Sequence, residues 1–237
     1  MLKCKNITKG FGKLVAIFDL SFDVEKGEIL GIAGPNGSGK TTLFNLITGV
    51  YQGSGEIIFD GKRINGLREY EICHRGIART FQKPEVFSTL TVVENVRVGA
   101  HFGAVKVKDE IKNINGVIDF IGLKGKENVI SSNLKLLDKK LVMIAAALAT
   151  KPKLLLLDEP IAGLSLQESG QVTALFKKIN KEFGITIIII EHFMRVLSEL
   201  SDRLMILNYG VQICMDSPLV VSKNKKVIEC YLGDDYA

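Results

Sequence analysis

The stretch Gly34-Pro35-Asn36-Gly37-Ser38-Gly39-Lys40-Thr41 decides how this chain is interpreted. An apolar segment at 28–33 precedes it and a helical pattern over 40–48 follows it. Glycines between a strand and a helix let backbone N–H groups face an anion, and Lys40 adds a positive charge. The pattern therefore predicts a phosphate-binding loop. A glycine turn that only caps a helix is the weaker interpretation, because both flanks fit the first.

The loop also contains groups suited to a nucleotide with its metal ion. Lys40 is expected to pair with the β- and γ-phosphates. The Thr41 hydroxyl is suited to ligate Mg²⁺, because this hard cation takes oxygen donors and shares them with phosphate oxygens and water. The residues assigned to cofactor binding are Gly34, Pro35, Asn36, Gly37, Ser38, Gly39, Lys40, Thr41 and the adjacent Thr42.

The composition favours one domain, or a core with a lobe, and excludes several other classes. The chain has 237 residues, of which 46% are hydrophobic, so it can bury a core. Its net charge is +5, but 31 basic residues are scattered among 26 acidic ones, so no nucleic-acid groove is expected. The four cysteines lie far apart and suggest neither a zinc cluster nor a disulfide framework. Because the longest aliphatic runs are strand-sized, any membrane role is expected to come through a partner.

Short apolar runs alternate with helical patterns along much of the chain, which predicts a layered α/β sheet with strands buried on both faces. The predicted strands are 28–33, 154–157, 186–190, 204–207 and 211–214, and the predicted helices are 40–48, 139–150, 167–182 and 193–200. The segments 2–8, 20–24 and 55–59 are expected to form an antiparallel flank.

A change of pattern between about residues 83 and 150 predicts an inserted helical subdomain. Helical segments at 107–121 and 139–148 occur there without an intervening buried strand. We therefore expect a first part of the core with the antiparallel flank at 1–83, the helical subdomain at 84–150, and the second part of the core at 151–237.

Two acidic residues follow the apolar run at 154–157, at the carboxyl end of a predicted buried strand. Open α/β sheets collect ligands at that edge. We assign Asp158 to the metal shell and Glu159 to the attacking water. His192 also follows a strand, where an imidazole could hydrogen-bond a γ-phosphate, although a histidine so placed is by itself more often structural.

Taken in order, the phosphate loop, Arg79-Thr80-Phe81-Gln82, the stretch 155–160 and Glu191-His192 resemble the ATPase subunits of ABC transporters. The resemblance spans nearly the whole chain. It is strongest to the branched-chain (hydrophobic) amino-acid uptake group, which has sequences similar to residues 76–82, 90–95 and 227–233 of this chain. It implies an α/β fold with a P-loop (RecA-like) nucleotide-binding core, an antiparallel β flank and an inserted helical subdomain.

The resemblance also implies roles for single residues. Phe11 matches the aromatic residue that stacks on adenine, which favours ATP. Gln82 matches the glutamine that joins the γ-phosphate and Mg²⁺ site to the helical lobe. The resemblance places the dimer-facing loop at Gly163-Leu164-Ser165, and the loop that receives the permease at 83–87. The expected catalytic set is Glu159, His192, Lys40 and Gln82, and the expected metal set is Thr41, Gln82 and Asp158.

One departure from the family is large. A Leu-Ser-x-Gly-Glu/Gln signature is expected before the helix that leads into the Asp158 strand, and counting back gives Leu134-Lys135-Leu136-Leu137-Asp138. Lys135 stands where a serine would donate to the γ-phosphate of the partner's ATP, and Leu137 where a glycine would allow close backbone approach. We therefore expect an asymmetric heterodimer in which another subunit supplies the intact signature.

The expected function is ATP hydrolysis that drives uptake of branched-chain amino acids. The expected partners are a second ATP-binding subunit, transmembrane permease subunits and, indirectly, a solute-binding protein, with the chain on the cytoplasmic face of the membrane. An uptake ATPase for urea or short amides stays open, as does a non-transport ATP-binding regulatory switch. A GTPase is disfavoured because its Asn-Lys-x-Asp pattern is absent, and a repair ATPase because no long heptad run or Cys cluster is present.

Overall fold

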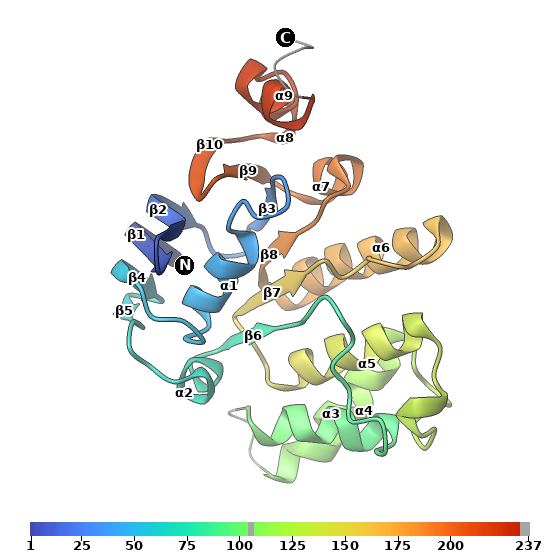
Figure 1. Cartoon of the computed structure of the whole chain (residues 1–237). Helices are drawn as coiled ribbons and strands as arrows, with labels where there is room; N and C mark the ends of the chain where they lie inside the picture. The colour runs from blue at the N-terminus through green and yellow to red at the C-terminus, as the bar shows by residue number, and fades with distance from the viewer. Residues whose placement is uncertain (104–106, 233–237) are drawn as a thin grey trace. The chain divides into compact units, whose positions relative to one another are not determined.

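The computed structural model describes residues 1–103 and 107–232, and its elements are labelled in Figure 1. The chain forms two compact units. The first unit combines Met1–Glu69 with Asn180–Ala237, and the second unit is Tyr70–Ile179. None of the helices in the described ranges has both the length and the apolar character needed to cross a bilayer.

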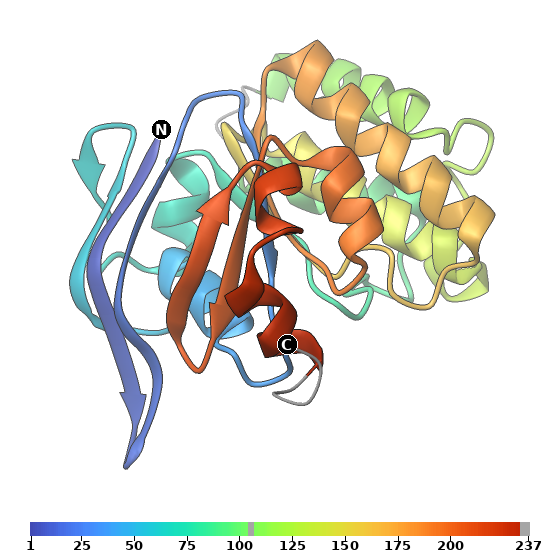
Figure 2. The same ribbon diagram turned by 90° about the horizontal axis from the view of Figure 1, so that it is seen from above.

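The first unit contains a four-stranded antiparallel sheet in the order β2-β1-β4-β5. Its strands are β1 (Leu2–Phe11), β2 (Leu14–Val24), β4 (Ser54–Phe59) and β5 (Lys62–Arg63). Buried and exposed residues alternate along much of β1 and β2, as in a sheet with one face on the core. Seen from above, β1 and β2 form the long blue hairpin of Figure 2. This sheet confirms the predicted antiparallel flank, with strands longer than expected.

The first unit also contains buried parallel strands. β3 (Ile29–Ala33) lies between β8 (Thr186–Ile190) and β9 (Arg203–Asn208), and β10 (Val211–Asp216) extends the sheet antiparallel to β9. Every residue of β3 and β8 is buried, and all of them except Thr186 are apolar or glycine, as in strands covered on both faces. The helices of this unit are α1 (Lys40–Ile47), α7 (Met194–Leu200), α8 (Pro218–Val221) and α9 (Lys225–Leu232).

A partly buried ion pair joins the starts of β3 and β9. Arg203 opens β9 and donates to both carboxylate oxygens of Glu28, at 2.6 and 2.9 Å. The bidentate bond raises the pKa of Arg203 and holds the residue before β3 against the start of β9. The pairing of Ile32 with Ile190 sets the carboxyl ends of β3 and β8, where the predicted site residues follow, in register.

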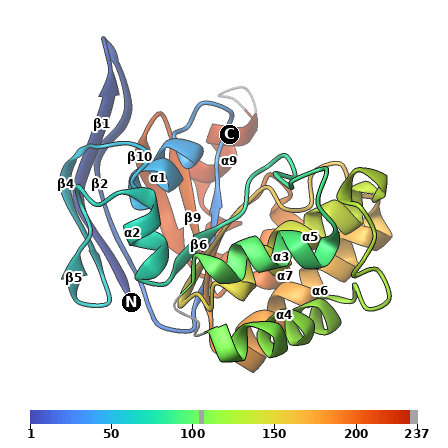
Figure 3. The ribbon, with the colours of Figure 1, turned by 90° about the horizontal axis from the view of Figure 1, so that it is seen from below.

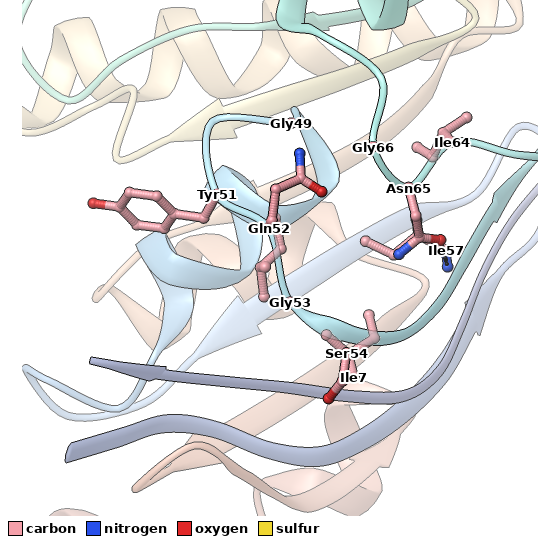
Figure 4. Close-up of a pocket in the computed structure, with 11 residues that line it drawn as sticks. Ile7, Gly49, Tyr51, Gln52, Gly53, Ser54, Ile57, Ile64, Asn65 and Gly66 are labelled. Atoms are coloured by element: carbon pink, nitrogen blue, oxygen red, sulfur yellow. Dashed lines mark hydrogen bonds between the residues drawn. The ribbon is translucent and has the colours of Figure 1, made fainter. Parts of the chain in front are cut away.

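A small cavity lies beside α1 in the first unit (Figure 4). Its volume is about 10 Å³, the space of roughly one water molecule, so it cannot hold a nucleotide. Apolar side chains of β1 and β4 line it, with the turn residues 51–53 and 64–66. The Tyr51 ring points away from the other lining side chains (Figure 4) and contacts Phe11 instead.

The second unit has a short parallel strand pair and a group of helices. β6 (Ile77–Arg79) pairs with β7 (Leu154–Asp158). Helix α3 (Val92–His101) packs against α4 (Val107–Ile121) and α5 (Leu136–Ala149), as Figure 3 shows in green to yellow. A 3-10 turn (Ser131–Asn133) precedes α5, α6 (Leu166–Phe183) follows β7, and α2 (Glu69–His74) precedes β6.

The predicted elements compare closely with the observed ones. The helix expected at 107–121 has those bounds, whereas α5 begins at Leu136, three residues before the predicted start at 139. The sequence interpretation did not anticipate α2, α3 or the strand β6. The compact units divide the chain after residues 69 and 179. The expected division into core and helical subdomain at 83/84 and 150/151 stays a prediction. Gly233, the last residue of the family-like string 227–233, lies outside the described residues.

A reciprocal cap sets where α3 begins. The Thr91 side chain accepts from the Glu94 N–H, and Glu94 Oε2 accepts from the Thr91 N–H at 2.8 Å. These hydrogen bonds from Thr91 lower the pKa of Glu94 below its ordinary value of 4.5. A carboxylate with a lowered pKa stabilises the fold above the unfolded-state pKa, and this contribution is lost as pH falls through the folded-state value.

We therefore expect Thr91→Ala to lower the free energy of unfolding by about 1 kcal/mol at pH 7. The cost should shrink as pH falls below 4.5, because Glu94 then becomes protonated in the unfolded and later in the folded chain. Urea unfolding at pH 7 and at low pH measures both values. Thr89→Ala, at an exposed turn position two residues earlier, is the matched control. A Thr91→Ala cost that does not change with pH would contradict the assignment to the cap.

Candidate active site

The phosphate loop spans the turn between β3 and α1 in the first unit. Gly39 is the N-cap of α1 in a left-handed conformation, and no acidic residue occupies the first turn of the helix. The first N–H groups of a helix have no partner within it and carry partial positive charge, so this terminus favours an anion. Gly37 and Asn36 are exposed, whereas Ser38 and Gly39 are buried. The predicted strand, loop and helix are all present.

The backbone is too close to neighbouring strands for side chains at two of the glycines. A Cβ on Gly34, which has φ +151°, would lie 2.0 Å from the Leu207 oxygen. A Cβ on Gly39, which has φ +104°, would lie 2.5 Å from the Ala16 oxygen. The loop is thus wedged between β9 and β2, and Gly210 binds it from a third side by donating its N–H to the Ser38 oxygen at 3.0 Å. Glycine is required here for space as well as for conformation.

Lys40 lies across the loop that it follows in sequence. Its Nζ donates to the main-chain oxygens of Gly34 and Pro35 at 2.8 and 2.9 Å, and its side chain is buried. The ammonium group therefore sits within the curve of the loop. Thr41 is exposed in the first turn of α1, and Thr42 is half-buried.

His192 follows β8 in the first unit, two residues beyond its end. β8 runs parallel to β3 with Ile190 opposite Ile32, so His192 and the phosphate loop leave the sheet at the same edge. Glu191 is 1% exposed, and one of its carboxylate oxygens accepts from the His192 N–H at 3.3 Å. His192 itself is exposed. Ligands collect at this edge of open α/β sheets, and the phosphate role of His192 stays a prediction.

Phe11, the predicted adenine-stacking residue, ends β1 in the first unit. Its ring is in edge contact with Tyr51 at 5.1 Å between centroids, and Lys9 Nζ lies 4.9 Å from its centroid. Phe11 remains 42% exposed, so part of the ring is open to a stacking partner. The sequence interpretation did not identify Tyr51 or Lys9, which hold this ring in place.

The second unit brings together Asp158, Glu159 and Gln82 with a residue that was quoted in a motif but given no role. Arg79 ends β6, Asp158 ends β7, and Arg79 Nη2 donates to Asp158 Oδ2 at 2.8 Å. Both side chains are buried, with 7% and 6% exposure. The guanidinium also stacks over Phe81, at 5.0 Å from the ring centroid. Arg79 therefore orients the carboxylate that was predicted to bind the metal.

Glu159 and Gln82 meet directly. Gln82 Nε2 donates to Glu159 Oε2 at 2.7 Å, and Lys140 Nζ lies 3.4 Å from the main-chain oxygen of each. Glu159 has φ +46°, in the left-handed region that non-glycine residues rarely adopt. Backbone strain of this kind is held in place by surrounding contacts and clusters at active sites.

The stretch 134–138 forms the start of α5. Leu134 is buried, and Lys135 is the exposed N-cap without a side-chain cap bond. Leu137 is half-buried and lines an apolar groove between α5 and α6 with Leu141 and Leu175, so its side chain is not fully presented to solvent. Asp138 is paired with Lys126 at 2.7 Å.

The loop after β7 lies beside this stretch within the second unit. A Cβ on Gly163 would meet the Leu136 side chain at 3.2 Å. The main-chain and side-chain donors of Ser165, with a smaller contribution from Lys135, hold the pKa of Glu168 below its ordinary value. The two segments that the family places at its dimer interface are therefore neighbours here.

Comparison with known proteins identifies the family of this chain. The model of the ABC transporter family matches residues 17–162. The chain belongs to the ABC transporter family. It is 32% identical to the high-affinity branched-chain amino acid transport ATP-binding protein BraF of Pseudomonas aeruginosa, over 99% of this chain and 98% of that protein. It is also 32% identical, with the same coverage, to LivG of Escherichia coli K12, which has the corresponding name.

Solved structures support the same assignment. A nucleotide-free ATP-binding cassette of an ABC transporter has a TM-score of 0.88 and 31% identity, with 99% of each chain covered. The ADP conformation of an ATP-binding cassette of an ABC transporter gives the same values. This ABC transporter chain is therefore an ATP-binding subunit with the ATPase fold, and its predicted fold class is confirmed.

Arg79 gives this ABC transporter subunit a buried charge pair that can be tested for stability. We expect Arg79→Met to lower the free energy of unfolding by about 3–5 kcal/mol, because Asp158 would keep a buried charge without its guanidinium partner. Urea unfolding measures the loss, with Arg97→Met at an exposed position of α3 as control. The double variant Arg79→Met/Asp158→Leu should regain most of the stability. A double variant less stable than Arg79→Met would contradict this explanation.

Proposed function

We propose that this subunit hydrolyses ATP to drive uptake of branched-chain amino acids through a membrane permease. The observation that carries the substrate class is the full-length similarity to transport proteins named for these amino acids in bacteria and in Archaeoglobus fulgidus. ATP hydrolysis itself follows from membership of the family. In this proposal the chain lies at the cytoplasmic face of the membrane, bound to permease subunits that receive solute from a solute-binding protein.

Each predicted site residue of the first unit has a proposed part in binding the nucleotide. Phe11 stacks on adenine with its exposed ring face, and the loop N–H groups surround the phosphates at the N-terminus of α1. Lys40 neutralises charge on the β- and γ-phosphates from its position within the loop. His192, at the same edge of the sheet, hydrogen-bonds the γ-phosphate.

The second unit supplies the groups proposed to act on water. The water oxygen attacks the γ-phosphorus in line with the bond to the β–γ bridging oxygen, which breaks and leaves with ADP. Glu159 orients that water and accepts its proton. Gln82, hydrogen-bonded to Glu159 at 2.7 Å, keeps the Glu159 carboxylate in its orientation. It also couples the presence of the γ-phosphate to the helical part of the unit.

The donors fit Mg²⁺ as the accompanying ion. Asp158 supplies a carboxylate that Arg79 orients, Thr41 an exposed hydroxyl and Gln82 an amide oxygen. Mg²⁺ is bound in such enzymes by one or two carboxylates together with substrate phosphates and water. When bound, the ion would neutralise charge between the β- and γ-phosphates.

The segment 83–87 is the proposed contact with the permease. Phe87 is 57% exposed, which is unusual for a large apolar side chain unless a partner covers it. Its backbone is fixed by buried Asn95, whose Oδ1 accepts from the Phe87 N–H at 2.8 Å and whose Nδ2 donates to the Phe87 oxygen at 3.1 Å. A rigid loop with an exposed aromatic ring suits a docking site.

Uptake in proteoliposomes that contain this subunit with its permease tests the proposal. We expect ATP-dependent accumulation of labelled leucine, isoleucine and valine, and none with Lys40→Ala in place of the wild-type chain. Labelled urea and acetamide, offered in parallel, test the alternative uptake ATPase. Accumulation of urea or acetamide without leucine would replace the proposed substrate class.

The altered signature supports an asymmetric pair of ATP-binding subunits. Lys135, which is exposed, and Leu137, which is half-buried, would face a partner's nucleotide in place of a serine and a glycine. We expect the chain alone to hydrolyse ATP slowly and an intact-signature subunit to raise its turnover. Phosphate release, measured with and without that subunit, tests this expectation. Vigorous, cooperative hydrolysis by the chain alone would overturn the heterodimer.

A regulatory switch that holds ATP without rapid turnover is the second candidate, and the same observation at Lys135 favours it. The two candidates differ in their partners. Co-purification of the tagged chain from membranes with a permease supports transport. Recovery without any membrane protein, together with slow hydrolysis under every condition, supports the switch.

A further inference from the structure

Lys140 is a lysine in the second unit with almost no exposure to solvent. It lies in the second turn of α5, is 1% exposed, and ranks among the largest fully buried side chains of the described chain. Burying an ammonium group is costly unless hydrogen bonds compensate, whereas methionine would fill similar volume at no such cost. Packing alone therefore gives no reason for a lysine here.

The Lys140 ammonium group contacts the main chain of two predicted site residues. Its Nζ lies 3.4 Å from the main-chain oxygens of both Gln82 and Glu159. The side chains of these two residues are themselves bonded, Nε2 to Oε2, at 2.7 Å. The three residues thus form a closed ring of contacts. The side chains of Gln82 and Glu159 are bonded to each other, and Lys140 Nζ contacts the main-chain oxygens of both.

Helix α5 holds the segment after β6 at a second point as well. The Phe81 N–H donates to Met143 Sδ at 3.4 Å, and Met143 is three residues beyond Lys140 on the same face of the helix. Glu159 also has the left-handed backbone noted above, with φ +46°. Donation to its carbonyl by Lys140 is a restraint that helps to keep this unfavourable conformation.

We propose that Lys140 is a positioning residue for hydrolysis, which sets the placement of Glu159 and Gln82 relative to each other. It does not touch the nucleotide in this proposal, and it acts through the two main-chain oxygens. Because α5 begins at the stretch 134–138, a displacement of that helix start would also reach Glu159 through Lys140. The inference rests on the roles proposed above for Glu159 and Gln82.

Turnover of the assembled transporter with Lys140→Met tests the inference. We expect turnover to fall roughly 10- to 100-fold, the effect of a small misplacement of a catalytic group. Affinity for a fluorescent ATP analogue should stay at the wild-type value, because the phosphate loop is unchanged. Lys139→Met makes the same substitution at the adjacent, half-exposed position of α5 and should match the wild type in both measurements. Wild-type turnover in Lys140→Met would overturn the inference.

A double variant separates positioning from a loss of general stability. In a closed ring, breaking one link releases the other, so Gln82→Ala/Lys140→Met should be no slower than the slower single variant. Independent effects would instead multiply, and that result would contradict the ring. Should Lys140→Met fail to fold by circular dichroism, the folded variants Lys140→Arg and Lys140→Gln decide. Turnover in the order Lys, Arg, Gln supports the inference, and equal turnover overturns it.

Glu159→Gln distinguishes failure of this inference from failure of the proposed site. If Glu159→Gln is inactive while Lys140→Met equals Lys139→Met, Lys140 is not a positioning residue and the site stands. If Glu159→Gln keeps wild-type turnover, the proposed role of Glu159 fails and the inference fails with it.

Discussion

Glu159→Gln is expected to lower ATP turnover by about 10²–10⁴-fold while leaving ATP binding intact. The substitution keeps the shape of the side chain and leaves an amide oxygen that can still accept from Gln82 Nε2, at present 2.7 Å from the carboxylate. The glutamine cannot accept the proton of the attacking water. Steady-state phosphate release by the assembled transporter measures the loss, and binding of a fluorescent ATP analogue measures the retained affinity.

Glu127→Gln is the matched control for this variant, because Glu127 is an acidic residue in the loop between α4 and α5 whose side chain accepts from the Gly125 N–H. Its turnover should equal that of the wild type. Should Glu159→Gln retain more than about a tenth of the turnover, the general-base contribution would be smaller than such residues supply, and another group would have to orient the water.

The sequence was sufficient for the parts of the site that depend on neighbours in the chain. The phosphate loop could be predicted because its glycines, Lys40 and the following helix are consecutive. The placement of Asp158 and His192 after buried strands could be predicted for a similar reason, since a continuously apolar segment followed by a polar residue indicates the end of a strand.

Contacts between distant segments could not be predicted in this way. Arg79 and Asp158 are 79 residues apart, and no pattern in either segment specifies their ion pair. Lys140 belongs to a helix whose apolar periodicity already explains its fold, and its contacts with Gln82 and Glu159 appear only when three elements are placed together. A charged residue at a helix position that the apolar pattern would bury was the one available signal.

The same limit applies to the altered signature. Counting along the chain placed Leu137 at a glycine position and suggested an obstructing side chain. The structure begins α5 at Leu136, so Leu137 lies in the first turn and lines the groove beside α6. Of the two substitutions, Lys135 is therefore the exposed one and Leu137 is half-buried. Their effect on a partner's nucleotide depends on a surface that spacing alone could not orient.

Gly39→Ala is expected to weaken ATP binding at least tenfold and to destabilise the first unit. Alanine at φ +104° adds backbone strain of about 1–3 kcal/mol. Its Cβ would also lie 2.5 Å from the Ala16 oxygen and 2.7 Å from Ile17 Cδ1, and such overpacking costs about 1–3 kcal/mol more. Relief of the clash requires the loop to move away from β2, which turns its N–H groups from the phosphates.

Each hydrogen bond lost to a charged phosphate costs about 1.5–3 kcal/mol, so ATP affinity should fall roughly 10- to 100-fold for each donor displaced. Titration with a fluorescent ATP analogue and thermal unfolding measure the two effects. Gly170→Ala is the matched control, because Gly170 lies in α6 with no heavy atom within 4 Å of an added Cβ. That variant should gain about 0.5–1 kcal/mol from lower chain entropy in the unfolded state. Wild-type affinity in Gly39→Ala would show that the loop binds phosphate with a backbone that can shift away from β2 without loss.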